Sequence, residues 1–129
     1  MNPPDLTLVT GLERFPDAPE GVVCWSGRVS GTSPVPVHLI LQDQPVASLD
    51  AGFIDAVCAD AGRWLRVAAD AAGLEGDPAS WDPEINFRAG REWAVRFTEA
   101  PGRSELGIMV VFTGECVTAI DDLEEWEDA

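Results

Sequence analysis

The stretch Leu49–Ala72 restricts the possible folds of this chain more than any other, because its apolar residues recur at the spacing of an α-helix. Placed at steps of about 100° per residue, the apolar side chains share one arc and the charged ones lie opposite. The apolar arc holds Phe53, Ile54, Val57, Cys58, Ala61, Trp64, Leu65 and Ala68. The pattern predicts one long amphipathic helix, with Ser48 as its N-cap and Gly73 just beyond its end.

The segments on either side of this helix alternate between apolar and polar residues, which indicates strands with one face on a core. The predicted strands are Val22–Ser30, Val35–Gln42, Ile85–Arg88, Glu92–Thr98, Leu106–Thr113 and Cys116–Ile120, with Asp5–Thr10 as a candidate for an additional edge strand. Short Gly-rich and Pro-rich connections separate them and predict an antiparallel meander. Because Gly107–Phe112 contains no polar residue, we expect a central strand there.

The order of these elements is β-β-α-β-β-β-β. We therefore predict an α+β fold in which an antiparallel sheet of five to seven strands packs one face on the long helix. The chain has 129 residues and neither a repeat nor a linker. We expect a single globular domain, 1–129, with an acidic C-terminal segment at 115–129.

The charge of the chain limits its partners. It has 23 acidic and 8 basic residues and a formal net charge of −15. Such a balance excludes double-stranded nucleic acid and an anionic membrane surface as ligands, and it favours a basic protein. The chain has no apolar run long enough for a membrane span, and its first residues do not form a secretory signal. We expect a bacterial protein of the cytoplasm, and the odd number of cysteines favours three buried thiols over disulfides or zinc.

The connection Gly73–Glu84 is the first candidate site, because it is the longest loop and combines four acids with one tryptophan. Trp81, Asp82 and Glu84 are its predicted contact residues, with Trp81 as an aromatic anchor for a partner. In the alternative interpretation, Trp81 folds back over the end of the helix and covers the core.

The C-terminal segment is the second candidate site. Seven acids and no base occur between Glu115 and Asp128. Asp122, Glu125 and Trp126 are the predicted contact residues, since complementary charge speeds association with a basic partner. In the alternative interpretation, Trp126 packs on the protein's own sheet. The acids lack the ordered ligand spacing of an EF-hand, so we predict no metal, and nothing in the sequence indicates a cofactor.

Catalytic motifs are absent from the sequence: it has no phosphate-binding glycine loop, no HExxH and no GxSxG. His38 is the single histidine, and its position within a strand favours a structural role. Cys24 on the neighbouring strand could face His38 as a thiol and imidazole pair. Pairs of carboxylates that act as acid and base remain an alternative.

The second half of the chain, WAVRFTEAPGRSELGIMVVFTGECVTAIDDLEEW, follows a long amphipathic helix and an Asp-Pro loop. In this topology and in its acidity the chain, over residues 20–126, resembles small acidic bacterial immunity proteins of toxin systems. The resemblance implies physical occlusion, in which an acidic face covers the basic active site of a toxin without chemistry of its own.

The leading hypothesis is therefore a non-enzymatic acidic module that binds and inhibits a basic protein such as a toxin. Two alternatives remain open. One is a small enzyme or ligand-binding domain that uses carboxylates in a pocket between helix and sheet. The other is a structural subunit that self-associates, for example as a homodimer, through an exposed sheet edge.

Overall fold

A computed structural model describes residues 3–30, 35–99 and 107–122. Its strands are β1 (Val9–Arg14), β2 (Val22–Val29), β3 (Pro36–Gln42), β4 (Pro83–Phe87), β5 (Glu92–Phe97), β6 (Ile108–Thr113) and β7 (Cys116–Asp122). Its helices are α1 (Ala51–Ala59) and α2 (Ala61–Ala71), with short 3-10 turns η1 (Val46–Ser48) and η2 (Pro78–Trp81). The fold is α+β, as the sequence predicts.

The seven strands form one sheet, and their order in space is their order in the chain, from β1 to β7. All neighbours are antiparallel except β3 and β4, which are parallel. The chain leaves β3, runs through both helices and returns to start β4, because a parallel pair needs a long crossover connection. The sheet is thus two antiparallel meanders, β1–β3 and β4–β7, which meet at this parallel junction.

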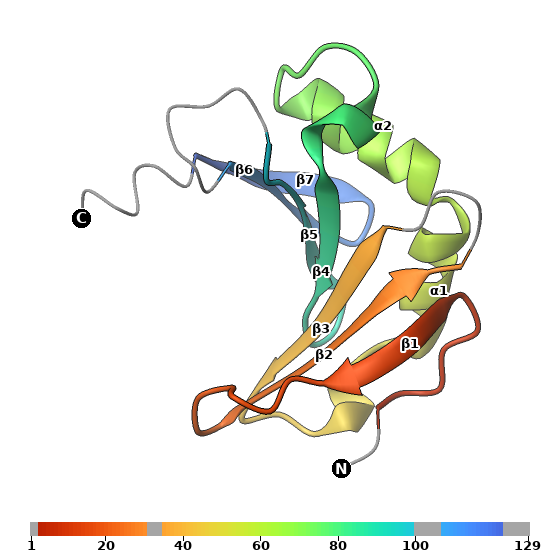
Figure 1. Cartoon of the computed structure of the whole chain (residues 1–129), viewed down its shortest axis with the longest axis vertical. Coiled ribbons are helices and arrows are strands. Elements are labelled where there is room, and N and C mark those ends of the chain that lie inside the picture. The colour runs from red at the N-terminus through yellow and green to blue at the C-terminus, as the bar shows by residue number, and fades with distance from the viewer. Residues whose placement is uncertain (1–2, 31–34, 100–106, 123–129) are drawn as a thin grey trace.

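The predicted long helix is divided in two at Asp60. The backbone of Asp60 has φ −124° and ψ 35°, so this residue ends α1 and begins α2. Aspartate favours such an end position because its side chain competes with helical backbone hydrogen bonds. The break lets the two helices follow the bend of the sheet (Figure 1). The predicted apolar arc remains on the sheet side across the break, with Ile54, Val57 and Trp64 buried.

The start of the helical segment also differs from the prediction. Asp50, rather than Ser48, is the N-cap of α1, and its carboxylate accepts a hydrogen bond of 3.1 Å from the backbone N–H of Phe53. Ser48 instead lies in η1, where its hydroxyl donates to the carbonyl of Pro45. An Asp and a Ser two residues apart are both good caps, so the sequence alone does not separate them.

The core lies between the helices and one face of the sheet, which Figure 1 shows to be the convex face. The residues of that face are buried on every strand from β2 to β6; examples are Trp25, Leu39, Ile85, Val95 and Val110. Trp93 of β5 occupies its centre and stacks on Phe112, with ring centroids 4.2 Å apart. Within the described residues the core contains no buried polar or charged residue.

Two strands differ from the predictions. The first strand is β1, at Val9–Arg14, whereas the sequence suggested Asp5–Thr10. It pairs with β2 and makes the element order β-β-β-α-α-β-β-β-β. The apolar run that becomes β6 is not central but second from the edge, between β5 and β7. It is apolar on both faces because Met109 and Val111 are half-buried on the face opposite the helices.

Candidate functional site

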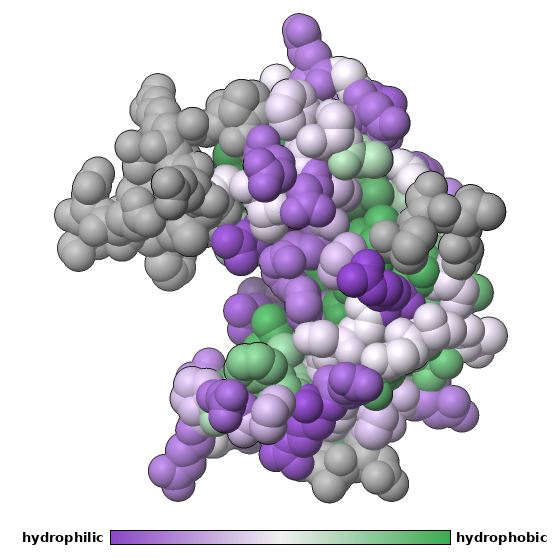
Figure 2. Space-filling model, viewed as in Figure 1, coloured by the Kyte–Doolittle hydropathy of each residue, from purple (hydrophilic) through white to green (hydrophobic). Residues whose placement is uncertain are grey.

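The face of the sheet opposite the helices, which we call the open face, is covered by no helix (Figure 1). The sheet bends toward this face, and Figure 2 shows the molecule hollowed on that side. The bend explains why side chains of the open face are half-buried although no helix or strand of the described residues is packed over them; examples are Ser26, Ile40, Asn86 and Met109.

Four polar side chains of the open face form a chain of contacts across β2, β3, β4 and β5; we call Ser26, His38, Glu84 and Arg96 the polar row. The Ser26 hydroxyl lies 2.8 Å from Nδ1 of His38. Nε2 of His38 lies 3.4 Å from one carboxylate oxygen of Glu84, and a guanidinium nitrogen of Arg96 lies 3.5 Å from the other. The row therefore crosses the parallel junction between β3 and β4.

Glu84 is the electrostatic centre of the polar row. Its hydrogen bond with His38 lowers the pKa of the carboxyl, and the charges of His38 and Arg96 add to this effect against the opposing effect of burial. The side chains of Glu84 and His38 are 20% and 27% exposed, so water screens their interaction only in part. The carboxylate thus stabilises the folded state in its ionised form.

The replacement Glu84→Gln is expected to lower the stability at neutral pH by about 1 kcal/mol. Since the folded-state pKa of Glu84 lies below its ordinary value of 4.5, this contribution is complete above that value. It is lost as the pH falls through the lowered folded-state pKa. Urea unfolding at pH 7, 5, 4 and 3 should therefore show the gap between wild type and variant closing in acid.

A matched control for this experiment is Glu92→Gln. Glu92 lies on β5, the strand that also carries Arg96, but its side chain is exposed. Its effect at pH 7 should be small, because an exposed side chain contributes little to stability. A gap between Glu84→Gln and the wild type that stays constant from pH 7 to pH 3 would contradict the role of Glu84.

The contacts of the polar row follow the order hydroxyl, imidazole, carboxylate, which is the order found in acyl-transfer enzymes. A hollow of about 410 Å³ lies beside Ser26 and His38 and is also lined by Arg28 and Glu13. In this geometry His38 can accept the proton of Ser26 at Nδ1 while Nε2–H donates to Glu84. However, Arg96 also neutralises the carboxylate, which weakens its effect on the imidazole.

The predicted pair of Cys24 and His38 does not form. Cys24 lies opposite Ile40, and Ser26 takes the position opposite His38. Burial raises the pKa of the Cys24 thiol, which disfavours a thiolate. Burial likewise raises the pKa of the Cys58 thiol to about 12. Cys116 is exposed and Cys24 is only partly buried, so the expectation of three buried thiols is correct for Cys58 alone.

Trp81 and Asp82 lie side by side but play different parts. Trp81 is partly buried against the core, and its indole N–H donates to the carbonyl of Glu75 at 3.2 Å. This placement supports the interpretation in which Trp81 covers the core. Asp82 is exposed and has the left-handed φ of 51°; its carboxylate accepts from the hydroxyl of Thr98 at 2.8 Å.

The remaining predicted contact residues lie at or beyond the end of β7. Asp122 is the last residue of β7, and Glu125 and Trp126 fall outside the described residues. The register nevertheless relates the two candidate segments. Pro83 pairs with Phe97, Phe97 with Ile108 and Ile108 with Asp122. Asp122 is thus three strand spacings, about 14 Å, from the start of β4 and at the same end of the sheet.

Further acids gather at this end of the sheet. The backbone N–H of Glu99 donates to the carbonyl of Trp81 at 3.0 Å, which holds the end of β5 against η2. We call the following residues the acidic end: Glu75, Asp77, Asp82, Glu99 and Asp122. Glu84 is the second residue of β4 and lies next to the acidic end, but its carboxylate contacts His38 and Arg96 of the polar row. The sequence indicated the Gly73–Glu84 connection and the C-terminal segment as separate candidate sites. It could not show that the pairing of β4 to β7 puts Asp122 and the start of β4 at the same end of the sheet.

Sequence reasoning singled out two members of the polar row, Glu84 as a contact residue and His38 as a structural histidine, but it missed Ser26 and Arg96. The signal of the row is weak: each member is a single polar residue at an outward position of a strand. Only the register brings the four into contact, and the parallel pairing of β3 and β4 could not be deduced from the helix between them.

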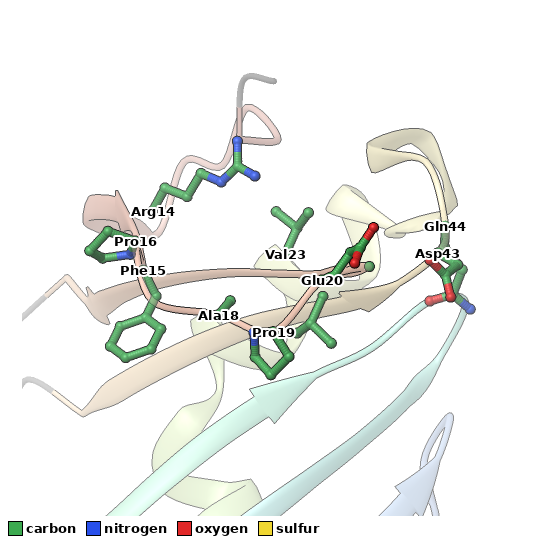
Figure 3. Close-up of a pocket in the computed structure, with 11 residues that line it drawn as sticks. Arg14, Phe15, Pro16, Ala18, Pro19, Glu20, Val23, Asp43 and Gln44 are labelled. Atoms are coloured by element: carbon green, nitrogen blue, oxygen red, sulfur yellow. The ribbon is translucent and has the colours of Figure 1, made fainter.

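A further hollow of about 730 Å³ lies at the opposite end of the sheet, between the β1–β2 connection and the end of β3. Figure 3 shows the Phe15 ring at one end of it and Asp43 and Gln44 at the other. Phe15 is 52% exposed, and the charged residues that line this hollow are exposed too. It is a wide surface notch rather than an enclosed ligand pocket.

Two further searches of the structure concern metals and membranes. Within residues 3–30, 35–99 and 107–122, no three His, Cys, Asp or Glu side chains are grouped so that they could hold a metal ion. No helix of the same ranges is long and apolar enough to cross a bilayer.

Comparison of the chain with protein-family models, with curated proteins and with solved structures finds no match.

Proposed function

We propose that this protein is a non-enzymatic acidic binding module of the cytoplasm that occludes a basic surface of another protein, as an immunity-type inhibitor covers a toxin. The acidic end of the sheet is the proposed docking surface, with Trp81, Asp82, Asp122, Glu125 and Trp126 as contact residues. Glu84 supports this surface from the polar row. The presence of free thiols at Cys24, Cys58 and Cys116 is consistent with a reducing compartment.

The observation that supports the proposal is the register of β4 to β7, in which Asp122 and the start of β4 lie at the same end of the sheet. After Arg103 the sequence contains no base, so the acids that follow β6 have no cation beside them along this part of the chain. An acidic surface attracts a basic partner over long distances and speeds its association.

Reversal of charge at three positions tests the proposal. A partner is first captured from a lysate of the source cell at low salt, identified by mass spectrometry and purified. The variant with Asp122, Glu124 and Glu125 all changed to lysine should then associate with it at least tenfold more slowly at low salt. The on-rate of this variant should also depend less on salt than that of the wild type. Stopped-flow kinetics at two salt concentrations measures both.

The matched control changes three exposed acids at the opposite end of the sheet, Asp17, Glu20 and Glu92, to lysine. It alters the net charge equally, so it should reduce the on-rate less if position matters. Equal rates for both variants would remove the acidic end from the docking surface. A partner with no excess of basic residues, or recovery of the protein alone at low salt, would overturn the proposed function.

A second candidate function, ester or amide hydrolysis, is supported by the contact order of Ser26, His38 and Glu84. In such a reaction the Ser26 oxygen bonds to the substrate carbonyl carbon and its proton moves to His38 Nδ1. The bond from that carbon to the alcohol or amine breaks, and the leaving group takes the proton. Water then cleaves the acyl–Ser26 ester, which releases the acid and restores the Ser26 hydroxyl. A fluorophosphonate probe distinguishes the two functions. If the probe labels the wild type but not the Ser26→Ala variant, hydrolysis is supported. If the probe does not label Ser26 in the wild type, hydrolysis is excluded as a function of this serine.

A further inference from the structure

The strand β7 ends the sheet, since within the described residues it pairs only with β6. Such an edge carries backbone N–H and C=O groups that no neighbouring strand uses, and another chain can pair with them. The regular part of β7 is Ala119–Asp122, where each residue has one partner on β6, from Val111 to Ile108. A bulge interrupts the register just before Ala119. The regular row of backbone groups on the outer edge of β7 is therefore confined to the half of the strand next to the acidic end.

The other edge of the sheet is less suited to pairing. Its strand, β1, is interrupted by a register shift between Thr10 and Glu13, and Gly11 there has a positive φ of 68°. Bulges of this kind twist an edge away from an approaching strand. Among the described residues, β7 is therefore the edge strand with the regular stretch of four residues, Ala119–Asp122, and it ends in two acids.

Apolar surface accompanies this edge on the helix side of the sheet. Val110 of β6 is fully buried under the helices, but Ile120, which pairs with it, is 47% exposed. Val117, near the start of β7, is 38% exposed. The helices thus leave these two side chains of β7 partly uncovered, although α2 approaches the strand. A strand added beside β7 would cover Ile120 with every second side chain and leave the alternate side chains on the open face.

We propose that β7 accepts a β-strand of the basic partner beside Ala119–Asp122, with apolar side chains of that strand against Ile120 and basic ones on the open face. This inference rests on the proposed function and specifies how the partner is held. A second copy of this chain fits the edge less well, because pairing β7 with itself brings acidic strand ends together. Like charges on facing strands are destabilising, and no base follows Arg103 to relieve them.

The test uses the full-length chain, labelled with ¹⁵N, and two synthetic peptides. One is acetyl-Arg-Val-Arg-Val-Arg-Val-Arg-amide, and the other has the same sequence with the backbone nitrogens of its five inner residues methylated. Both carry the same charge and side chains, but only the first can donate inner backbone hydrogen bonds to an edge. Amide chemical shifts identify the residues affected, and titration at constant salt gives both dissociation constants.

We expect the first peptide to bind at least fivefold more tightly than the methylated one, with the largest shift changes at Ala119–Asp122. The variant Ile120→Gln should weaken binding of the first peptide severalfold without a change of charge. Phe15→Gln is its matched control, because Phe15 is an equally exposed apolar residue at the far end of the sheet. It should leave the affinity unchanged.

Three results would overturn this inference. Equal affinity for the two peptides would show attraction by charge alone, which leaves the proposed function intact but removes the strand pairing. Shift changes concentrated away from β7 would place the docking surface elsewhere. A concentration-dependent dimer in light scattering whose β7 amides shift on dilution would show that a second copy occupies the edge. The proposed function itself fails separately, in the capture and charge-reversal experiment.

Discussion

Replacement of Trp93 by alanine should lower the free energy of unfolding by about 3–5 kcal/mol, the largest loss expected for one side chain here. Trp93 is 1% exposed and contacts aromatic rings on the sheet and on both helices. It stacks on Phe112 and Phe87, with centroids 4.2 and 5.8 Å away, and meets Trp64 and Phe53 edge-on. Its removal would leave a cavity that the rigid sheet cannot close.

The variant would also lose a hydrogen bond. The indole N–H of Trp93 donates to the carbonyl of Gly114 at 2.8 Å and so fixes the turn between β6 and β7. Urea denaturation at pH 7, followed by circular dichroism, measures the loss. Trp81→Ala is the matched control: Trp81 is only partly buried, so its loss should stay below about 2 kcal/mol. Similar losses for the two variants would contradict the central position of Trp93.

Gly107→Ala should cost about 3 kcal/mol or more, because two unfavourable effects coincide at this residue. Gly107 has φ 83°, a left-handed conformation that costs an alanine about 1–2 kcal/mol. A Cβ at this position would also overlap the backbone carbonyl oxygen of Phe97. That carbonyl belongs to a paired central strand, so it cannot move aside without disturbing β5.

Two other glycines separate these effects. Gly114 has φ 60°, but a Cβ there would meet nothing within 4 Å, so Gly114→Ala should show the conformational cost alone. Gly62 lies in α2 with open space around it, and Gly62→Ala should stabilise the protein by about 0.5–1 kcal/mol. Thermal unfolding of the three variants measures the series. Equal effects at Gly107 and Gly114 would show that the contact with Phe97 is relieved at no cost.

Sequence patterns predicted the parts of the fold that depend on local periodicity. The buried side of the helical segment is correct at Ile54, Val57 and Trp64, and strand alternation is correct around Leu39 and Val95. Local patterns did not reveal the division at Asp60, because the apolar arc continues past it without a change of phase. The two helices on either side of the break follow the bend of the sheet, which is a tertiary property that no local pattern encodes.

Features that depend on strand pairing were beyond the sequence. The parallel pairing of β3 with β4 joins residues separated by the whole helical segment, and no local signal specifies it. The polar row depends on that pairing, so its contacts between His38 and Glu84 could not be foreseen. Conversely, Asp82 and Asp122 were selected separately for acidity, and the register then placed their segments at one end of the sheet.

The parallel junction has a bearing on how the molecule comes apart. It comprises three residue pairs, Val37 with Ile85, His38 with Asn86 and Leu39 with Phe87, fewer than any antiparallel junction between β2 and β7. Segments joined by few backbone pairs tend to open as separate cooperative units. Partial unfolding should therefore divide the protein into its two meanders before either one melts. The contact of His38 with Glu84 spans this boundary, so protonation of Glu84 in acid weakens the link between the two meanders, together with the contact of Glu84 with Arg96 inside the second one.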